Sequence, residues 1–124
     1  MERRRNYRHT FQDSLAAEIL VSGRPPARRA RIVNLSLGGT VFVLEDQTIR
    51  LHADTWLIVR FKIPSGQFDY PARVIHNRLQ ETTVEHGAEF LPLSDARINQ
   101  VRERSLWAFL IEEQRRAVRT RQVH

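Results

Sequence analysis

Short segments that alternate apolar and polar residues, separated by tight turns, make up most of the sequence before residue 92. In the first of them, which begins at Ser14, Leu15, Ala17, Ile19 and Val21 fall on one side of an extended chain, as a half-buried strand requires. Six such segments, rich in β-branched residues, predict six short strands. They cover residues 14–22, 29–35, 40–45, 55–63, 67–77 and 82–90. We therefore expect a mainly β fold, an antiparallel barrel or sandwich, because no helix separates the strands as a βαβ unit requires.

Glycine and proline mark the connections between these predicted strands. Residues 23–26, the pair Gly38-Gly39 and residues 64–66 are typical of turns. Pro71 lies inside the fifth predicted strand and lacks the amide hydrogen that a sheet uses. We therefore expect part of this strand to be an edge or a bulge.

A single helix is predicted after the last strand. Ser94 is a good N-cap, Asp95 suits the first turn, and the helix is expected to span residues 94–118, before a basic tail at 119–124. Around the helix axis, the apolar residues 106–111 point in almost every direction. One face can cover the barrel. The apolar residues on the other faces of the helix predict one of two arrangements. Either the helix packs more deeply against the barrel and leaves one aromatic residue exposed, or these residues form a surface for a dimer or a partner protein.

The length and composition exclude several classes of protein. A chain of 124 residues has the size of one domain. We therefore expect residues 1–124 to form a single domain, with a flexible Arg-rich leader at 1–13 and a barrel at 14–91. The absence of cysteine excludes disulfides, a thiolate nucleophile and a zinc site built on cysteines.

No catalytic or metal-binding constellation stands out in the sequence. The five histidines lack HxxxH or HExxH spacing, and no pair of carboxylates can be assigned acid and base roles. We expect no metal, no cofactor and no enzymatic activity. The first ten residues lack the apolar core of a signal peptide, and no segment approaches the roughly 18 apolar residues that span a bilayer. The expected location is the cytoplasm.

Arginine dominates the positive charge of the chain. There are 20 Lys and Arg residues against 14 Asp and Glu, a formal net charge of +6, and Lys62 is the only lysine. Arginine forms two-pronged hydrogen bonds to phosphate and to the O6/N7 edge of guanine, which favours an anionic, nucleotide-like partner. A genomic bias towards Arg codons accounts for the total equally well. The positions of the arginines must therefore decide between these interpretations.

Two segments contain the candidate binding residues. The leader carries four arginines within six positions, and the second predicted strand ends in a Gly-Gly turn. In an extended strand Asn34 and Ser36 project on the same face, while Gly38 and Gly39 permit positive φ and a close approach of a ligand to the backbone. Arginines that fold down on this patch would bind phosphates and guanine, which predicts a dianionic guanine nucleotide as ligand. The candidate binding residues are Arg3, Arg4, Arg5, Arg8, Asn34, Ser36 and Gly39.

This pattern resembles the two-part signature of PilZ domains, bacterial receptors for cyclic di-GMP. Two arginines spaced as Arg-x-x-x-Arg near the start are followed by Asn-x-Ser-x-x-Gly at the end of the second predicted strand. The segment 30–36 also looks like the family's second strand, and 87–90 resembles its Gly-x-x-Phe stretch. The residues that carry the two-part signature are Arg4, Arg8, Asn34, Ser36 and Gly39.

The resemblance implies a six-stranded split β-barrel with a C-terminal helix that binds cyclic di-GMP on its outer surface, often as an intercalated dimer of the nucleotide. It assigns the clamp on guanine and phosphate to the paired arginines, with Arg3 and Arg5 assisting, and the other side of a guanine to the Asn-x-Ser-x-x-Gly residues. Position 34 is Asn where Asp is commoner in the family. The amide can donate to guanine O6 but cannot accept both N1–H and N2–H. His76 stands where some members carry a stacking Trp, and a surface His without a ligand role is the alternative.

Three functions are compatible with the sequence. The first is a non-enzymatic cyclic di-GMP receptor whose leader orders over the nucleotide and so signals to a downstream protein. The second is a PilZ-like adaptor that binds no nucleotide and acts through the apolar helix. The third is a small RNA-binding or single-stranded-DNA-binding barrel, for which Trp56, Phe68 and Tyr70 are the stacking candidates. The expected oligomeric state is a monomer or a dimer through the C-terminal helix.

Overall fold

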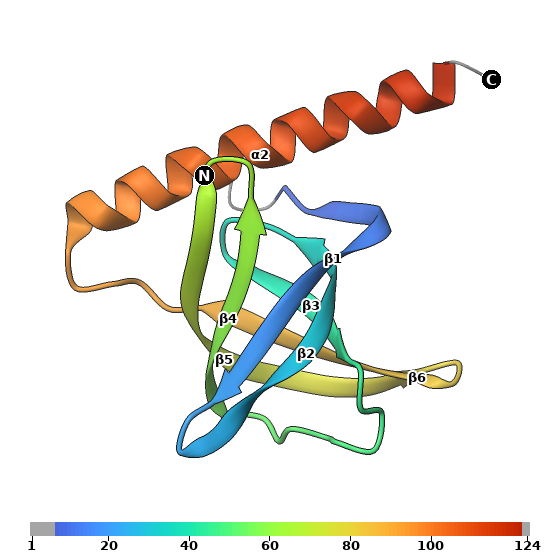
Figure 1. Ribbon diagram of the computed structural model, residues 1–124, viewed down its shortest axis with the longest axis vertical. Helices are drawn as coiled ribbons and strands as arrows, with labels where there is room; N and C mark the ends of the chain where they lie inside the picture. Colours follow the sequence, from blue (N-terminus) through green and yellow to red (C-terminus); the bar gives the residue numbers. More distant parts are fainter. Residues whose placement is uncertain (1–6, 123–124) are drawn as a thin grey trace.

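Six antiparallel strands close into a barrel, and one long helix follows them (Figure 1). The computed structural model of the chain describes residues 7–122. Around the barrel the strands follow the order β1-β2-β3-β6-β5-β4, and β4 pairs with β1 to close the sheet. The predicted mainly β class, the antiparallel barrel and the C-terminal helix are confirmed. The elements are β1 (His9–Val21), β2 (Arg24–Leu35), β3 (Gly39–Leu44), β4 (Trp56–Ile63), β5 (Gly66–Gln80), β6 (Thr83–Phe90) and α2 (Ala96–Gln122).

The core fills the inside of the barrel, because alternation points every second side chain of a strand inward. Ile19, Ile32, Phe42, Val59 and Val74 come from five different strands, and none of them has exposed surface. Burial of this kind stabilises a fold by about 25 cal/mol for each Å² of apolar surface removed from water. The period-two pattern of the sequence therefore identifies the inward face of the strands.

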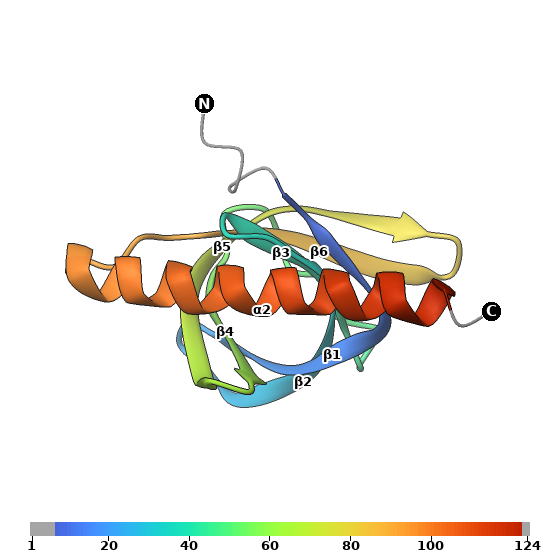
Figure 2. The same cartoon turned by 90° about the horizontal axis from the view of Figure 1, so that it is seen from above.

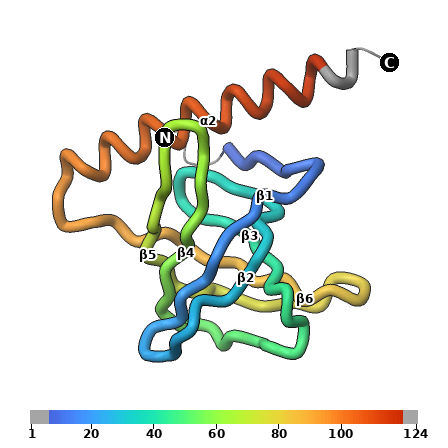
Figure 3. Tube along the Cα trace, in the orientation of Figure 1, coloured from blue at the N-terminus to red at the C-terminus, as the bar shows by residue number. Residues whose placement is uncertain are grey.

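The helix α2 lies across one end of the barrel (Figure 2). Leu106 and Leu110 have no exposed surface and close the core at that end. Trp107, beside them, is partly buried, and the ring of Tyr7 meets it edge-on with the ring centroids 5.6 Å apart. The start of β1 runs beside α2 (Figure 3). The apolar residues that surround the helix axis thus meet the barrel on one side and the N-terminal segment on another.

A second aromatic contact completes this cover. The rings of Phe11, in β1, and Phe109, in α2, have their centroids 6.2 Å apart. The aromatic residues of the segment 106–111 are therefore partly buried, and Ala108 is its exposed member. The expectation that a deeper fit leaves one aromatic residue exposed is wrong, because the N-terminal segment supplies aromatic partners that the helix pattern alone does not reveal.

The helix begins two residues later than its predicted start and continues past its predicted end. The N-cap is Asp95, not Ser94: its Oδ1 accepts hydrogen bonds from the backbone N–H groups of Arg97, at 2.9 Å, and Ile98, at 3.4 Å. A carboxylate in this position also interacts favourably with the helix dipole. At the other end α2 reaches Gln122, so the predicted tail is helical over most of its length.

Strand β1 begins at His9, so the last residues of the predicted leader 1–13 belong to the sheet. Thr10 pairs with Asn34 and Leu15 pairs with Ile32, which leaves four residues of β1 opposite a single residue of β2. This wide bulge interrupts the alternation. The regular pattern consequently becomes visible in the sequence only near Leu15.

Three prolines lie within strands, at positions where pairing does not require a backbone N–H group. Pro25 and Pro26 are part of β2 rather than of a turn over residues 23–26, and they fall within a register shift between two β1–β2 pairs. Pro71 lies where β5 passes from pairing with β4 to pairing with β6, and its carbonyl accepts a hydrogen bond from Leu91, one residue beyond β6. Positions of this kind tolerate proline.

Among residues 7–122, no helix combines the length and the apolarity that crossing a lipid bilayer requires.

Candidate functional site

The two halves of the sequence motif meet on the outside of the barrel. Arg8 directly precedes β1, and Asn34 lies near the end of β2, opposite Thr10. A guanidinium nitrogen of Arg8, Nη1, donates a hydrogen bond to Asn34 Oδ1 at 3.1 Å, across 26 residues of chain. Because the amide oxygen is the acceptor, the amide nitrogen of Asn34 remains a donor. Arg8 is exposed and Asn34 is half-buried, so both side chains are accessible from solvent.

A bulge in β2 turns Asn34 outward. Ile32 pairs with Phe42 and Asn34 pairs with the next residue of β3, Val41, so two residues of β2 stand opposite one residue of β3. Ile32 points into the core, and strict alternation would send Asn34 the same way. The extra residue reverses the orientation. Thr40 then holds the position, because its Oγ1 donates to the backbone carbonyl of Asn34 at 2.7 Å.

Ser36 does not continue the face on which Asn34 lies, because β2 ends at Leu35. Its hydroxyl oxygen accepts hydrogen bonds from the backbone N–H groups of Gly38, at 3.3 Å, and Gly39, at 3.2 Å. Its own N–H donates to the Gly39 carbonyl at 2.9 Å. The residue is only 4% exposed. Ser36 therefore stabilises the turn that connects β2 to β3, and the predicted joint patch of amide and hydroxyl groups on one strand is not formed.

The two glycines of this turn have different roles, and neither adopts the positive φ that glycine permits. A Cβ on Gly39 would lie 2.3 Å from the backbone oxygen of Ala88, in β6. Nothing lies within 4 Å of a Cβ on Gly38. Position 39 therefore needs glycine because β3 and β6 approach closely there, whereas Gly38 leaves the backbone of the turn open to a ligand.

A row of paired residues extends this face across four strands. Asn34 in β2 pairs with Val41 in β3, Val41 pairs with Gly87 in β6, and Gly87 pairs with His76 in β5. The imidazole of His76 covers Gly87 closely: its Cε1 lies 2.5 Å from where a Cβ of Gly87 would be. The Gly-x-x-Phe stretch thus leaves room for an aromatic ring on the outer face. His76 itself is exposed.

An ion-pair network lies next to the turn. Glu89 pairs with Gly39 across the β3–β6 ladder and forms a hydrogen-bonded ion pair with Arg73. Arg73 also contacts Asp54 at 3.4 Å. Arg73 therefore carries one positive charge against two carboxylates, so the network has a formal net charge of −1.

Beneath the row, His86 is fully buried in β6. Its Nε2 accepts a hydrogen bond from the backbone N–H of Leu51 at 2.9 Å, and its ring stacks on Phe42 with the centroids 5.3 Å apart. Burial lowers the pKa of His86 from its ordinary value, and the nearby charge of His76 lowers it further. His86 is therefore held as the neutral ring.

The remaining sequence predictions have mixed outcomes. Arg3, Arg4 and Arg5 lie outside the described residues. Residues 7–122 contain no group of three His, Cys, Asp or Glu side chains that could hold a metal ion. The stacking row proposed for single-stranded nucleic acid is not formed: Trp56 is 59% exposed, but Tyr70 is buried and Phe68 packs against the core. Thr40 was not among the predicted site residues, because its only signal in the sequence is its place directly after the Gly-Gly pair.

Comparison with known proteins agrees with this geometry. The family model of the PilZ domain matches residues 2–106. Among solved structures, the chain is similar to a PilZ domain of YcgR from Escherichia coli with cyclic di-GMP, with 20% identity, a TM-score of 0.72 and 98% of each chain covered. No curated protein matches the sequence.

Two longer structures share the same fold. The complex of YcgR from Escherichia coli with cyclic di-GMP has 19% identity and a TM-score of 0.67, over 92% of this chain and 49% of that one. The inhibitor of motility MotI/DgrA from Bacillus subtilis has 20% identity and a TM-score of 0.64, over 92% of this chain and 51% of that one. This chain therefore spans about half the length of these two proteins. Because the family model extends over most of the sequence and includes both halves of the motif, the chain belongs to the PilZ domain family.

Proposed function

We propose that this chain is a receptor for cyclic di-GMP, without catalytic activity of its own, that binds the nucleotide on the outer face of the barrel. The observation that carries the proposal is the hydrogen bond between Arg8 and Asn34. It brings the two halves of the motif together at an accessible place, next to the open backbone of the turn at Gly38. The structures of similar fold that contain cyclic di-GMP support the choice of ligand.

The chemistry of these residues suits the nucleotide. Cyclic di-GMP carries two phosphates and two guanines, and a guanidinium binds either group through paired N–H donors. Arg8 would contribute such a fork, and the amide nitrogen of Asn34 would donate to guanine O6. Arg3, Arg4 and Arg5 would supply the remaining positive charge. Ser36 and Gly39 would act by fixing the turn against which the base lies.

Calorimetric titration with cyclic di-GMP tests the proposal. We expect micromolar or tighter binding to the full chain and a loss of at least about tenfold in affinity for Arg4→Ala and Arg8→Ala, since each removes hydrogen bonds from a charged donor. Ser36→Ala should weaken binding as well, with its melting temperature measured alongside because this side chain also holds the turn.

The matched control is Arg24→Ala, which removes the same charge from an exposed arginine at the other end of β2. Its affinity should equal that of the parent chain. An Arg8→Ala variant that binds as tightly as Arg24→Ala would contradict the assignment of the site.

We further propose that nucleotide binding orders the Arg-rich leader and so changes the surface offered to a downstream protein. Like charges in the leader repel one another, and two phosphates would neutralise them. Hydrogen exchange of the N-terminal peptide should slow when cyclic di-GMP is added to the parent chain. No slowing at saturating nucleotide would argue against this route of signalling.

Dimerisation through the helix is a separate proposal. The exposed large apolar side chains in the first part of α2 are Ile98 and Val101, three residues apart and therefore on one face of the helix. A light-scattering mass of the free protein decides between monomer and dimer, and a dimer should dissociate in an Ile98→Glu variant.

A further inference from the structure

The outer face of β1 carries a groove between the two strands that flank it. In the closed barrel β1 lies between β2 and β4 (Figure 1). The groove has a volume of about 400 Å³, and its wall is mainly apolar. Arg29, from β2, and Lys62, from β4, line it from opposite strands. Basic side chains thus border the groove on both sides. Its apolar lining consists of Leu15, Ala16, Ala17 and Phe61.

One row of paired residues on this face alternates in charge. Glu18, in β1, pairs with Arg29 of β2 on one side and with Arg60 of β4 on the other. Arg60 pairs in turn with Asp69 of β5 and donates two hydrogen bonds to it, at 2.9 and 3.1 Å. The hydrogen bonds to Asp69 raise the pKa of Arg60, and the charge of Glu18 adds to the increase. Each carboxylate of this row therefore lies beside a cation.

The neighbouring row has cations at the corresponding positions but no carboxylate. Ala16 lies two residues before Glu18 and therefore on the same face of β1. It pairs with Arg31 of β2, and the register of β1 with β4 places Lys62 on its other side. Lys62 pairs with a neutral residue of β5, Gln67. This row thus has a positive charge on each side of a methyl group.

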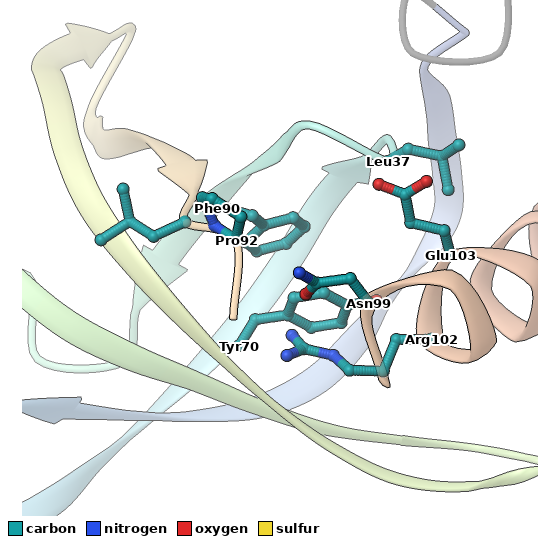
Figure 4. Close-up of a pocket in the computed structure, with 8 residues that line it drawn as sticks. Leu37, Tyr70, Phe90, Pro92, Asn99, Arg102 and Glu103 are labelled. Atoms are coloured by element: carbon teal, nitrogen blue, oxygen red, sulfur yellow. The ribbon is translucent and has the colours of Figure 1, made fainter. Parts of the chain in front are cut away.

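The two cations beside Ala16 are not occupied by other groups of the described chain. Arg31 and Lys62 are exposed, and neither forms an ion pair within residues 7–122. Arg102, in α2, differs in this respect. Its guanidinium stacks on Tyr70, with Cζ 3.7 Å from the centroid of the ring (Figure 4). Arg31 and Lys62 are therefore available for an anion from outside the chain.

We propose that this groove binds an acidic segment of another protein, in which a carboxylate neighbours an apolar side chain. The carboxylate would lie over Ala16, between Arg31 and Lys62, as Glu18 lies between the cations of the next row. A guanidinium binds both oxygens of a carboxylate at once. The apolar side chain of the segment would pack on the apolar lining of the groove, which removes apolar surface of both proteins from water.

A nucleic acid suits the same face less well. A continuous phosphate backbone would pass Glu18 and Asp69, whose charges repel it, whereas nucleic-acid binding gains its affinity from several phosphate contacts at once. Single strands also bind through bases that stack on exposed aromatic rings. Phe61, the aromatic residue of the lining, is buried. The face therefore favours a short acidic segment over a polyanion.

Fluorescence anisotropy with a labelled peptide tests the proposal on the full chain. The probe is a short synthetic peptide that repeats glutamate, leucine and serine, and the control peptide has glutamine in place of each glutamate. We expect saturable binding of the acidic peptide and at least about tenfold weaker binding of the control peptide. The absence of saturable binding up to concentrations on the order of 1 mM would overturn the proposal.

A pair of arginine variants separates the groove from the net charge of the chain. Arg31→Glu should weaken binding of the acidic peptide at least about tenfold, because it replaces an attractive charge by a repulsive one. Arg24→Glu makes the same change at an exposed position at the other end of β2 and should leave the affinity within about twofold. Equal losses in the two variants would refute a site at the groove.

Substitution of Ala16 tests the position of the carboxylate. Ala16→Glu supplies this group from the chain itself, whereas Ala16→Gln adds similar bulk without the charge. Both changes are at an exposed position, and melting temperatures confirm that the variants fold. The acidic peptide should bind Ala16→Glu at least about tenfold more weakly than Ala16→Gln. Equal affinities would contradict the proposed arrangement.

A single-stranded RNA serves as the competing probe. If the RNA binds and loses affinity in Arg31→Glu while the acidic peptide does not bind, the partner is a nucleic acid and the proposal is wrong. No cyclic di-GMP is present in any of these titrations, so their failure is separate from a failure of the proposed function.

Discussion

Replacement of Gly39 by alanine is expected to destabilise the barrel, whereas the same replacement of Gly38 is not. At position 39 the added Cβ would lie 2.3 Å from the carbonyl oxygen of Ala88, and Cβ atoms in proteins essentially never come closer than 3.0 Å. That oxygen belongs to the backbone of β6, so it cannot rotate away. At position 38 the added Cβ meets nothing within 4 Å, and φ is not positive.

The size of the effect follows from what must move. To relieve the overlap, the first residue of β3 must shift away from β6, which strains the Gly39–Glu89 pair. The shift also weakens the bond from Phe90 N–H to the Gly38 carbonyl, at 2.8 Å, and the bond from Ser36 N–H to the Gly39 carbonyl, at 2.9 Å. Overpacking costs about 1–3 kcal/mol, and a backbone hydrogen bond contributes about 1 kcal/mol. We expect Gly39→Ala to lower the free energy of unfolding by roughly 3 kcal/mol.

Gly38→Ala is the matched control for this change. Alanine reduces the conformational entropy of the unfolded chain, so this variant should gain about 0.5 kcal/mol. Gly87→Ala gives a third comparison, because the group it would meet is the exposed ring of His76, which can turn aside. Its loss of stability should lie between those of the other two variants.

Urea unfolding followed by far-UV circular dichroism and by tryptophan fluorescence measures all three variants. The midpoint should fall for Gly39→Ala at an unchanged slope, because the surface exposed on unfolding stays the same. A loss for Gly39→Ala no greater than that for Gly38→Ala would refute the argument. Glycine at position 39 would then serve ligand approach and not the packing of β3 on β6.

Three further predictions follow from the structure. Asn34→Asp should tighten cyclic di-GMP binding about tenfold, because a carboxylate can accept both N1–H and N2–H of guanine; weaker binding in calorimetry would contradict the proposed site. The lowered pKa of His86 means that the unfolded chain binds more protons than the folded one below the ordinary value of 6.5. Urea midpoints should therefore fall as pH decreases through that value, and His86→Gln, which keeps an acceptor but does not titrate, should flatten the dependence. Leu110→Ala should lower the free energy of unfolding by about 2–5 kcal/mol, since this side chain is fully buried under α2; a midpoint equal to that of the parent would show that α2 is not part of the core.

Much of the fold was predictable because its signals are local. Alternation identifies the inward residues of each strand, and Gly and Pro identify most of the turns. The errors arose where pairing across the sheet overrides the local pattern. His9 to Ser14 contain a bulge and therefore do not alternate regularly, and Pro25 and Pro26 lie in the sheet because a register shift leaves their positions unpaired. Both Ser94 and Asp95 are good N-cap residues. In the structure Asp95 is the one that accepts hydrogen bonds from the first backbone N–H groups of α2.

The candidate site was predictable as a set of residues but not as an arrangement. The motif spacing pointed to Arg8 and Asn34, and the structure brings these two into contact. The roles of Ser36 and Gly39 were not predictable, because they depend on where β2 ends and on how closely β6 approaches β3. The stacking of Arg102 on Tyr70 had no sequence signal, since the two residues come from α2 and β5.

The sequence by itself determined the six strands, the final helix, the inward faces and the family, because hydrophobic periodicity and motif spacing are properties of neighbouring residues. Only the tertiary structure decided that a bulge turns Asn34 outward, that Gly39 is required by a backbone carbonyl of β6, and that Arg102 stacks on Tyr70. Register, close approach and burial depend on which distant segments meet. A short stretch of sequence does not show these three features, because they result from all the contacts of the folded chain together.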